Sequence, residues 1–217
     1  GYWVNTNRET TIHGLYAAGD VAGGCPQKYV TGALVEGEIA ALDIVEKLKD
    51  QTFDITDNKE EQLLDEKVKE YNNILSDKDS IFTIEQMEEA MQKVMDAYVG
   101  GISSHYQFNE NCLNLAKEKI NNLITLSGQL SAQDYHELMF YYELKERLTI
   151  CLTLIEHLKA RKETRWHSFG ENTDYPEESN QWLKYVNSKR KPDGETEIIF
   201  RELVTGGKVY ECTDFTE

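Results

Sequence analysis

The sequence has little proline, little cysteine and no long apolar run. Three of its 217 residues are proline, which favours long helices because proline disrupts helix interiors. The four cysteines stand far apart, without a C-x-x-C pair or a Cys/His cluster. Neither a disulfide framework nor a metal site is therefore predicted. Free thiols in a reducing cytoplasm are the simpler interpretation.

The sequence is also short of positive charge. It has 23 basic and 39 acidic residues, a formal net charge of −16. This argues against nucleic acid and anionic membranes as partners, because both need a basic surface. No run of about 18 apolar residues occurs, so no membrane insertion is expected. Residues 1–10 show no signal-peptide pattern, and we expect a cytoplasmic protein.

Composition divides the chain into three zones. Residues 1–54 are rich in glycine and small apolar side chains, residues 55–165 are charged with helical periodicity, and residues 166–217 are aromatic and irregular before becoming strand-like. Within the first zone, residues 2–4 and 14–18 are typical of short buried strands. Residues 31–49 carry an apolar stripe typical of a helix.

The middle zone predicts a helical bundle. Apolar periodicity indicates four helices, over residues 59–76, from Thr83 to about 98, over 110–127, and from Ser131 to about 164. Thr83 and Gln86 form a capping-box pattern, and Ser131 is the expected N-cap of the last helix. Because the connections are short, the helices are expected to pack antiparallel.

The last zone predicts a short β-hairpin. Residues 182–186 and 196–201 have strand character, and residues 191–194 read Lys-Pro-Asp-Gly, a strong turn sequence. The predicted fold class is therefore mainly α: an antiparallel helical bundle, preceded by a strand–loop–helix unit and followed by this hairpin.

The strand–loop–helix unit near the N-terminus carries the clearest chemical signal. The predicted strand 14–18 would deliver Asp20 at its carboxyl end, where a carboxylate can accept hydrogen bonds from sugar or ribitol hydroxyls. Gly19 allows the backbone to approach a ligand closely. The helix start at Thr31, Gly32 and Ala33 offers free N–H groups to an anionic or carbonyl oxygen.

The run from Thr10 to Asp20 resembles the second flavin motif, T-x-x-x-G-L-Y-A-A-G-D, of FAD-dependent oxidoreductases. In that class the aspartate holds the FAD ribitol, and the next helix begins beside the isoalloxazine ring. The resemblance implies that Asp20 binds the ribitol of FAD. It also implies that Gly19, Thr31, Gly32 and Ala33 surround the flavin.

A second motif narrows the resemblance. Residues 161–167, with Arg161, Glu163, Arg165 and His167, are followed by Asp-Tyr-Pro at 174–176 and Trp-Leu at 182–183. This pattern resembles the R-x-E-S-R-G-x-H, D-Y-P and W-L signature that closes the C-terminal helical domain of fumarate reductase and succinate dehydrogenase flavoprotein subunits. The adenylylsulfate reductase alpha subunit belongs to the same superfamily. The order of motifs also agrees over nearly the whole chain.

One stretch favours the adenylylsulfate reductase branch. Fumarate reductases carry H-G-x-N-R after the flavin motif, with a proton-donating arginine, whereas residues 25–29 here are Cys-Pro-Gln-Lys-Tyr. Adenylylsulfate reductases have G-H-K-F, which Lys28 and Tyr29 match while Gln27 departs from it. By this resemblance Lys28 is a candidate catalytic cation. Arg165 is a second candidate, with a structural ion pair as the alternative.

The resemblance also implies partners outside these residues. The superfamily begins with a Rossmann-type G-x-G-x-x-G segment and has a substrate-capping domain, and neither pattern occurs here. The sequence therefore predicts the C-terminal portion of a longer FAD oxidoreductase. Alone it would bind FAD weakly or not at all and be inactive. An iron–sulfur subunit and a second copy of the chain are further candidate partners. Two alternatives stay open: an acidic helical interaction module without catalysis, and one chain of a split flavoprotein.

Overall fold

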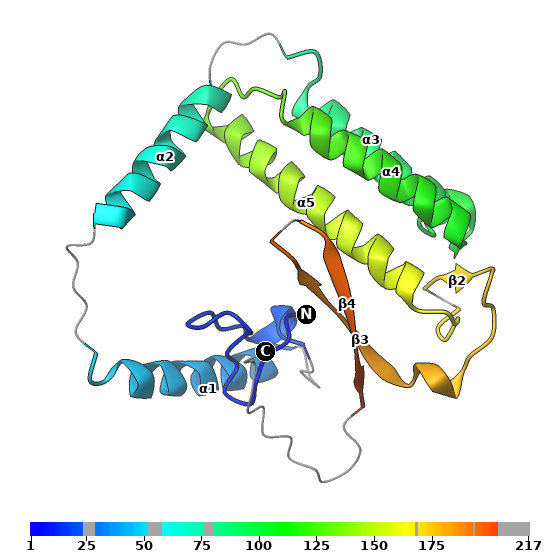
Figure 1. Cartoon of the computed structure of the whole chain (residues 1–217), viewed down its shortest axis with the longest axis horizontal. Coiled ribbons are helices and arrows are strands. Elements are labelled where there is room, and N and C mark those ends of the chain that lie inside the picture. The colour runs from blue at the N-terminus through cyan, green and yellow to red at the C-terminus, as the bar shows by residue number, and fades with distance from the viewer. Residues whose placement is uncertain (24–28, 52–57, 76–79, 168, 193, 204–217) are drawn as a thin grey trace. The chain divides into compact units, whose positions relative to one another are not determined.

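The computed structural model describes residues 1–23, 29–51, 58–75, 80–167, 169–192 and 194–203. The chain divides into two compact units, Gly1–Asp57 with Val204–Glu217 and Asn58–Leu203. Figure 1 traces the path of the chain and labels its elements. Each unit is considered by itself.

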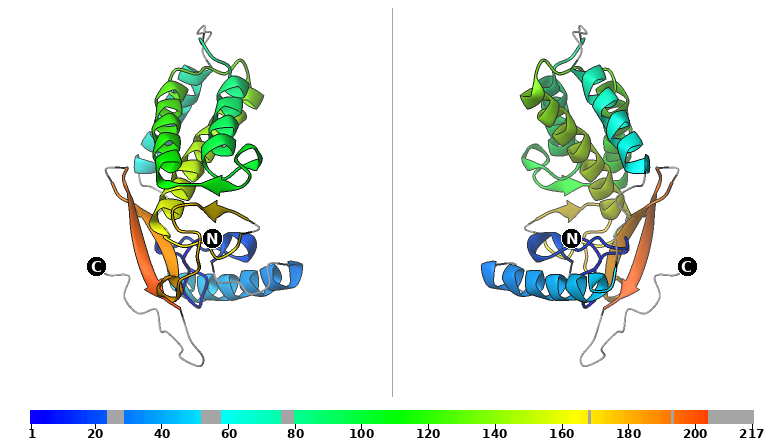
Figure 2. Two further views of the ribbon diagram at one scale, coloured as in Figure 1. Left: turned by 90° about the vertical axis from the view of Figure 1, so that its right-hand side faces the viewer. Right: turned by 90° about the vertical axis from the view of Figure 1, so that its left-hand side faces the viewer.

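Helices dominate the unit Asn58–Leu203. They are α2 (Asn58–Ile74), α3 (Ile84–Tyr98), α4 (Glu110–Ser127) and α5 (Tyr135–Ala160). Helices α3, α4 and α5 pack against one another, and consecutive ones run in opposite directions (Figures 1 and 2). The predicted mainly α fold with an antiparallel bundle is confirmed.

The core of this unit lies between α3, α4 and α5. Met87 and Met91 contribute from α3, each less than a tenth exposed. The largest fully buried apolar side chains come from α4 and α5 and are Leu113, Ile120, Leu144, Leu148 and Ile155. They recur at helical spacing, which is the amphipathic pattern by which the sequence predicts these helices.

The helix starts follow side-chain capping. The predicted capping box of α3 is present: the Thr83 hydroxyl accepts from the Gln86 N–H, and the Gln86 side chain accepts from the Thr83 N–H. The prediction of Ser131 as the N-cap of α5 is wrong. Asp134 takes that place, and its carboxylate accepts from the Glu137 N–H. Before it, the buried Ala132 donates its N–H to the Ile74 carbonyl at 2.8 Å.

Helix α5 ends four residues before the predicted end at 164. Arg161 has extended backbone angles (φ −88°, ψ 110°). The next residues leave the helix and bury Glu163 and Thr164. A short strand further on, β2 (Glu171–Asn172), pairs in parallel with β1 (Gln107–Phe108), as Figure 2 shows. The sequence did not predict this pairing.

The predicted hairpin is confirmed with a shifted first strand. Strand β3 (Lys184–Arg190) pairs antiparallel with β4 (Thr196–Glu202). Trp182, predicted as the start of the strand, lies in a 3-10 turn, Asn180–Trp182. In the connecting turn, the Lys191 N–H donates to the Glu195 carbonyl at 2.8 Å. Both strands contact α5, and His157 on α5 lies 2.9 Å from the Ser188 hydroxyl on β3.

The unit Gly1–Asp57 contains α1 (Val30–Leu48), close to the predicted helix 31–49. The strands predicted at residues 2–4 and 14–18 do not form. The described residues make isolated bridges instead, Tyr2 to Ala22, Val4 to Thr10 and Glu9 to Tyr16. A buried strand needs a hydrogen-bonded neighbour along its length, and these bridges supply one pair at a time. Among the described helices, none is long and apolar enough to cross a membrane.

Candidate functional site

A tight turn packs against the first residues of α1. Gly19 begins a 3-10 turn, Gly19–Val21, with a left-handed φ of +72°. A Cβ atom placed on Gly19 would lie 3.1 Å from the Cβ of Ala33 in α1. Both the backbone angle and the close approach therefore favour glycine here.

The turn places the predicted flavin-binding residues near one another. Asp20 follows Gly19 directly and is exposed, as are Thr31 and Ala33, while Gly32 is half-buried. Tyr29, the N-cap residue of α1, provides no side-chain hydrogen bond to the first helical turn. The first N–H groups of a helix have no acceptor within the helix itself. Lys28 lies outside the described residues.

A buried carboxylate on α1 accepts a hydrogen bond from the Gly19–Val21 turn. Glu36 on α1 is only 4% exposed. Its Oε2 atom accepts the Gly19 N–H at 2.8 Å, and its Oε1 atom lies 3.3 Å from Nη1 of Arg8. The sequence alone does not single out Glu36, although its place one helical turn after Ala33 puts it on the side of α1 that faces Gly19.

A second polar network ties the N-terminal segment to α1. The Lys47 ammonium lies 2.6 Å from Glu9 Oε2, 2.8 Å from Asp43 Oδ2 and 3.0 Å from the Tyr16 hydroxyl. The Tyr16 hydroxyl donates to Asp43 at 2.5 Å. The hydrogen bonds from Lys47 hold the pKa values of Glu9 and Asp43 below their ordinary values. Those bonds raise the pKa of Lys47. The Asp43 and Lys47 spacing of four residues is the sequence signal for this network.

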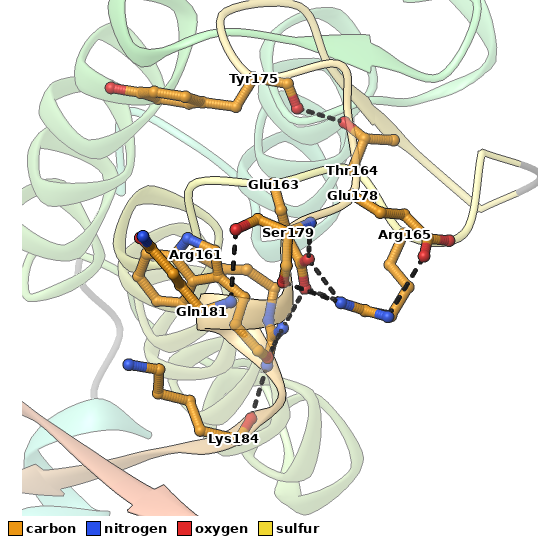
Figure 3. A network of polar contacts seen from close by, with 10 residues as sticks. Arg161, Glu163, Thr164, Arg165, Tyr175, Glu178, Ser179, Gln181 and Lys184 are labelled. Carbon is orange, nitrogen blue, oxygen red and sulfur yellow. Dashed lines mark hydrogen bonds and ion pairs between the residues drawn. The ribbon is translucent and has the colours of Figure 1, made fainter.

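In the helical unit, Arg161 and Arg165 meet at a buried carboxylate (Figure 3). The side chain of Glu163 is fully buried. It accepts from Arg161 Nη1 at 2.5 Å, from Arg165 Nη2 at 2.8 Å and Nε at 3.1 Å, and from the Ser179 N–H at 3.0 Å. Burial alone would raise the pKa of the Glu163 carboxyl, but the bonds from Arg165, Ser179 and Arg161 outweigh it. They hold that pKa below its ordinary value.

Both guanidinium groups have further partners. Arg161 donates to the carbonyls of Trp182 and Lys184, each at 2.9 Å, and lies over the Trp182 ring. Arg165 contacts Glu178 at 3.3 Å. These bonds join the end of α5 to the segment that leads into β3, within the helical unit.

A pocket of about 460 Å³ opens beside this cluster. Its apolar side includes Leu154 and Leu158 of α5. Near its rim the rings of Trp166 and Phe169, 66% and 74% exposed, lie 5.6 Å apart. The lining residues are Val99, Phe108, Leu154, Leu158, Arg161, Glu163, Thr164, Arg165, Trp166, Phe169 and Gly170. The described residues contain no group of three or more His, Cys, Asp or Glu side chains placed to hold a metal ion.

No protein-family model matches the chain. Two curated proteins are similar to it in sequence. The adenylylsulfate reductase alpha subunit of Megalodesulfovibrio gigas is 26% identical over 209 residues, 90% of this chain and 31% of that protein. An uncharacterized FAD-dependent oxidoreductase of Methanocaldococcus jannaschii is 28% identical over 197 residues, 88% of this chain and 34% of that protein.

Solved structures agree with these relatives. Adenylylsulfate reductase from Archaeoglobus fulgidus matches 91% of this chain with 33% of its own, at 33% identity and a TM-score of 0.77. Quinol fumarate reductase from E. coli has the same fold, with a TM-score of 0.76 at 18% identity over 95% of this chain and 37% of its own. The chain is similar in sequence to the adenylylsulfate reductase alpha subunit and to an FAD-dependent oxidoreductase, and it has the fold of fumarate reductase. It spans about one third of the length of the relatives it matches, consistent with their C-terminal portion.

Proposed function

We propose that this chain supplies part of the flavin site and the helical domain of an FAD-dependent oxidoreductase, in which electrons pass between the flavin and a small substrate. The observation that carries the proposal is the Gly19–Asp20 turn, packed against the start of α1. The two relatives named above, one of them FAD-dependent by name, support the same cofactor.

The residues of the turn fit FAD chemically. Asp20 is exposed and can accept hydrogen bonds from ribitol hydroxyls. The absent Cβ of Gly19 lets the turn pack against Ala33 at the start of α1. The N–H groups of Thr31 and Gly32 would face the polar ring edge of FAD. Bound FAD would supply the two-electron redox chemistry.

The candidate catalytic residues have different surroundings. Lys28 is the proposed cation at the substrate, by its place after the flavin motif. Arg165 is the second candidate, and its side chain is 26% exposed while it pairs with Glu163 and Glu178. Its existing ion pairs favour a role in holding the loop that follows α5.

We further propose that the 217-residue chain is inactive alone. Several apolar side chains of α1 are exposed, including Leu34 at 69% and Leu42 and Val45 at 65% each. An apolar helix face of this kind usually packs against another element. An FAD-binding and a capping domain would cover it in the whole protein. An iron–sulfur subunit is the proposed electron partner.

The test compares the full-length protein that contains this sequence with the 217-residue chain. The full-length protein should purify with a flavin absorbance spectrum and reduce or oxidise a small substrate, with adenylylsulfate and fumarate assayed side by side. The short chain should show neither property. A full-length protein that binds no added FAD would overturn the proposal and favour the acidic interaction module.

Asp20→Ala in the full-length protein tests the site itself. Loss of charge-assisted hydrogen bonds of about 1.5–3 kcal/mol should weaken FAD binding by about tenfold to a hundredfold. Asp65→Ala, an exposed position on α2, is the matched control and should leave the Kd for FAD unchanged. An Asp20→Ala protein that binds FAD as tightly as the control contradicts the assignment.

A further inference from the structure

The turn that carries Asp20 is supported by a buried carboxylate and a partly exposed guanidinium group. Glu36 is 4% exposed, and its two oxygens have different partners: the Gly19 N–H at 2.8 Å and the Arg8 guanidinium at 3.3 Å. A buried carboxylate is stable only when it is paired and hydrogen-bonded. The two contacts, with the Gly19 N–H and with Arg8, therefore offset the cost of burying this side chain.

Arg8 is itself held in an uncommon conformation. Its φ of +72° lies in the left-handed region, which is unfavourable for a residue with a side chain. Its backbone is fixed on both sides, because its N–H donates to the Asn5 carbonyl at 3.1 Å and its carbonyl accepts from the Ala17 N–H at 3.0 Å. Strain of this kind persists where the surrounding contacts determine the conformation, and it is common at functional sites.

Gly19 is thus fixed from two directions. Ala33 limits its movement sterically, and Glu36, three residues further along α1, accepts its N–H. Asp20 is the next residue, so the orientation of its carboxylate follows the backbone of Gly19, whose N–H is bound by Glu36.

We propose that Glu36, with Arg8 as its counter-ion, is a positioning residue that sets the Gly19–Asp20 turn for flavin binding. This inference rests on the proposed function, because Asp20 must be the ribitol ligand for the orientation of the turn to matter. Glu36 acts through Gly19 and makes no contact with the cofactor itself.

The experiment uses the full-length protein, stripped of flavin and titrated with FAD. Glu36→Ala removes the acceptor of the Gly19 N–H, whereas Glu36→Gln keeps an acceptor oxygen and loses the charge opposite Arg8. We expect the Kd for FAD to rise tenfold or more in Glu36→Ala and by a smaller factor in Glu36→Gln. Glu38→Ala, an exposed residue on the same helix, is the matched control and should leave the Kd unchanged.

Hydrogen exchange separates positioning from a general loss of stability. In Glu36→Gln, which keeps an isosteric side chain, the amides of Gly19–Val21 should exchange faster while those of Leu144–Leu148 in α5 keep their protection. Unchanged FAD affinity in both Glu36 variants, with affinity lost in Asp20→Ala, would overturn the inference and leave the proposed function intact. Unchanged affinity in Asp20→Ala would remove the proposed function first.

Discussion

Replacement of Glu163 by alanine should destabilise the helical unit more than any exposed charge change. The carboxylate is fully buried and accepts four hydrogen bonds, three of them from guanidinium groups. Removing one partner of a buried ion pair usually costs about 3–5 kcal/mol, because the opposite charge stays behind without compensation. In Glu163→Ala, Arg161 and Arg165 would lose their shared counter-ion together.

The structure places the expected loss at the lower end of that range. The side chains of Arg161 and Arg165 are 33% and 26% exposed, so water can replace part of the lost bonding. Arg161 also keeps its two carbonyl acceptors at Trp182 and Lys184. We therefore expect a loss of about 3 kcal/mol in the free energy of unfolding, which lowers the Tm by roughly 6–12 °C for a unit of this size.

The assay is urea unfolding followed by far-UV circular dichroism, which reports on the helices. Glu178→Ala serves as the control, since Glu178 is 56% exposed and contacts Arg165 at 3.3 Å. An exposed ion pair of this kind contributes at most about 1 kcal/mol. Equal losses in the two variants, or a loss below about 1 kcal/mol in Glu163→Ala, would refute the reasoning from burial.

Two further predictions concern the same unit. The Glu163 carboxyl has a lower pKa folded than unfolded, so its stabilisation is present above the unfolded pKa and is lost as the pH falls through the folded pKa. Below about pH 4.5 the wild-type free energy of unfolding should therefore fall more steeply than that of Glu163→Ala, as urea titrations across this range would measure. In the core, Leu148→Ala should cost about 3 kcal/mol because Leu148 is fully buried. Ile150→Ala, at a position 64% exposed on the same helix, should cost far less, and equal midpoints for the two variants would contradict the buried core.

The sequence predicts the helices well because their signals are local. Apolar periodicity and the capping box at Thr83 depend on residues within a few positions of one another, and α2, α3 and α4 lie within about two residues of the predictions. Helix α5 is harder at both ends. Ala132, before its start, donates to Ile74, and Glu163, after its end, accepts from the Ser179 N–H, and both partners are distant in sequence.

The sequence did not predict the contacts between segments that are distant in the chain. Strands β1 and β2 are two residues each and lie more than 60 positions apart in the sequence. Two residues are too few to show the alternation of apolar and polar side chains that predicts a strand. The same holds for Glu36, whose role depends on Gly19 and Arg8 folding back onto α1. By contrast, the sequence could single out Gly19 and Asp20 as candidates because the motif that resembles a flavin site is a contiguous run of residues. The sequence motif pointed to the Gly19–Asp20 turn, and the structure added the contacts of that turn with Glu36 and Ala33.

The two units are stabilised by different forces, and the candidate flavin turn lies in the one with little apolar core. In the described part of Gly1–Asp57, the buried apolar residues are Ala17, Ala22 and Ala40. Ion pairs at Glu36 and Lys47 supply the main side-chain contacts there. Three buried methyl groups provide little hydrophobic free energy, at about 0.8 kcal/mol for each CH₂-sized group. Salt should therefore weaken this unit more than the helical one, and a neighbouring domain that covers α1 would add the apolar burial that it lacks. The geometry of the candidate flavin turn is set by Glu36, Arg8 and Ala33.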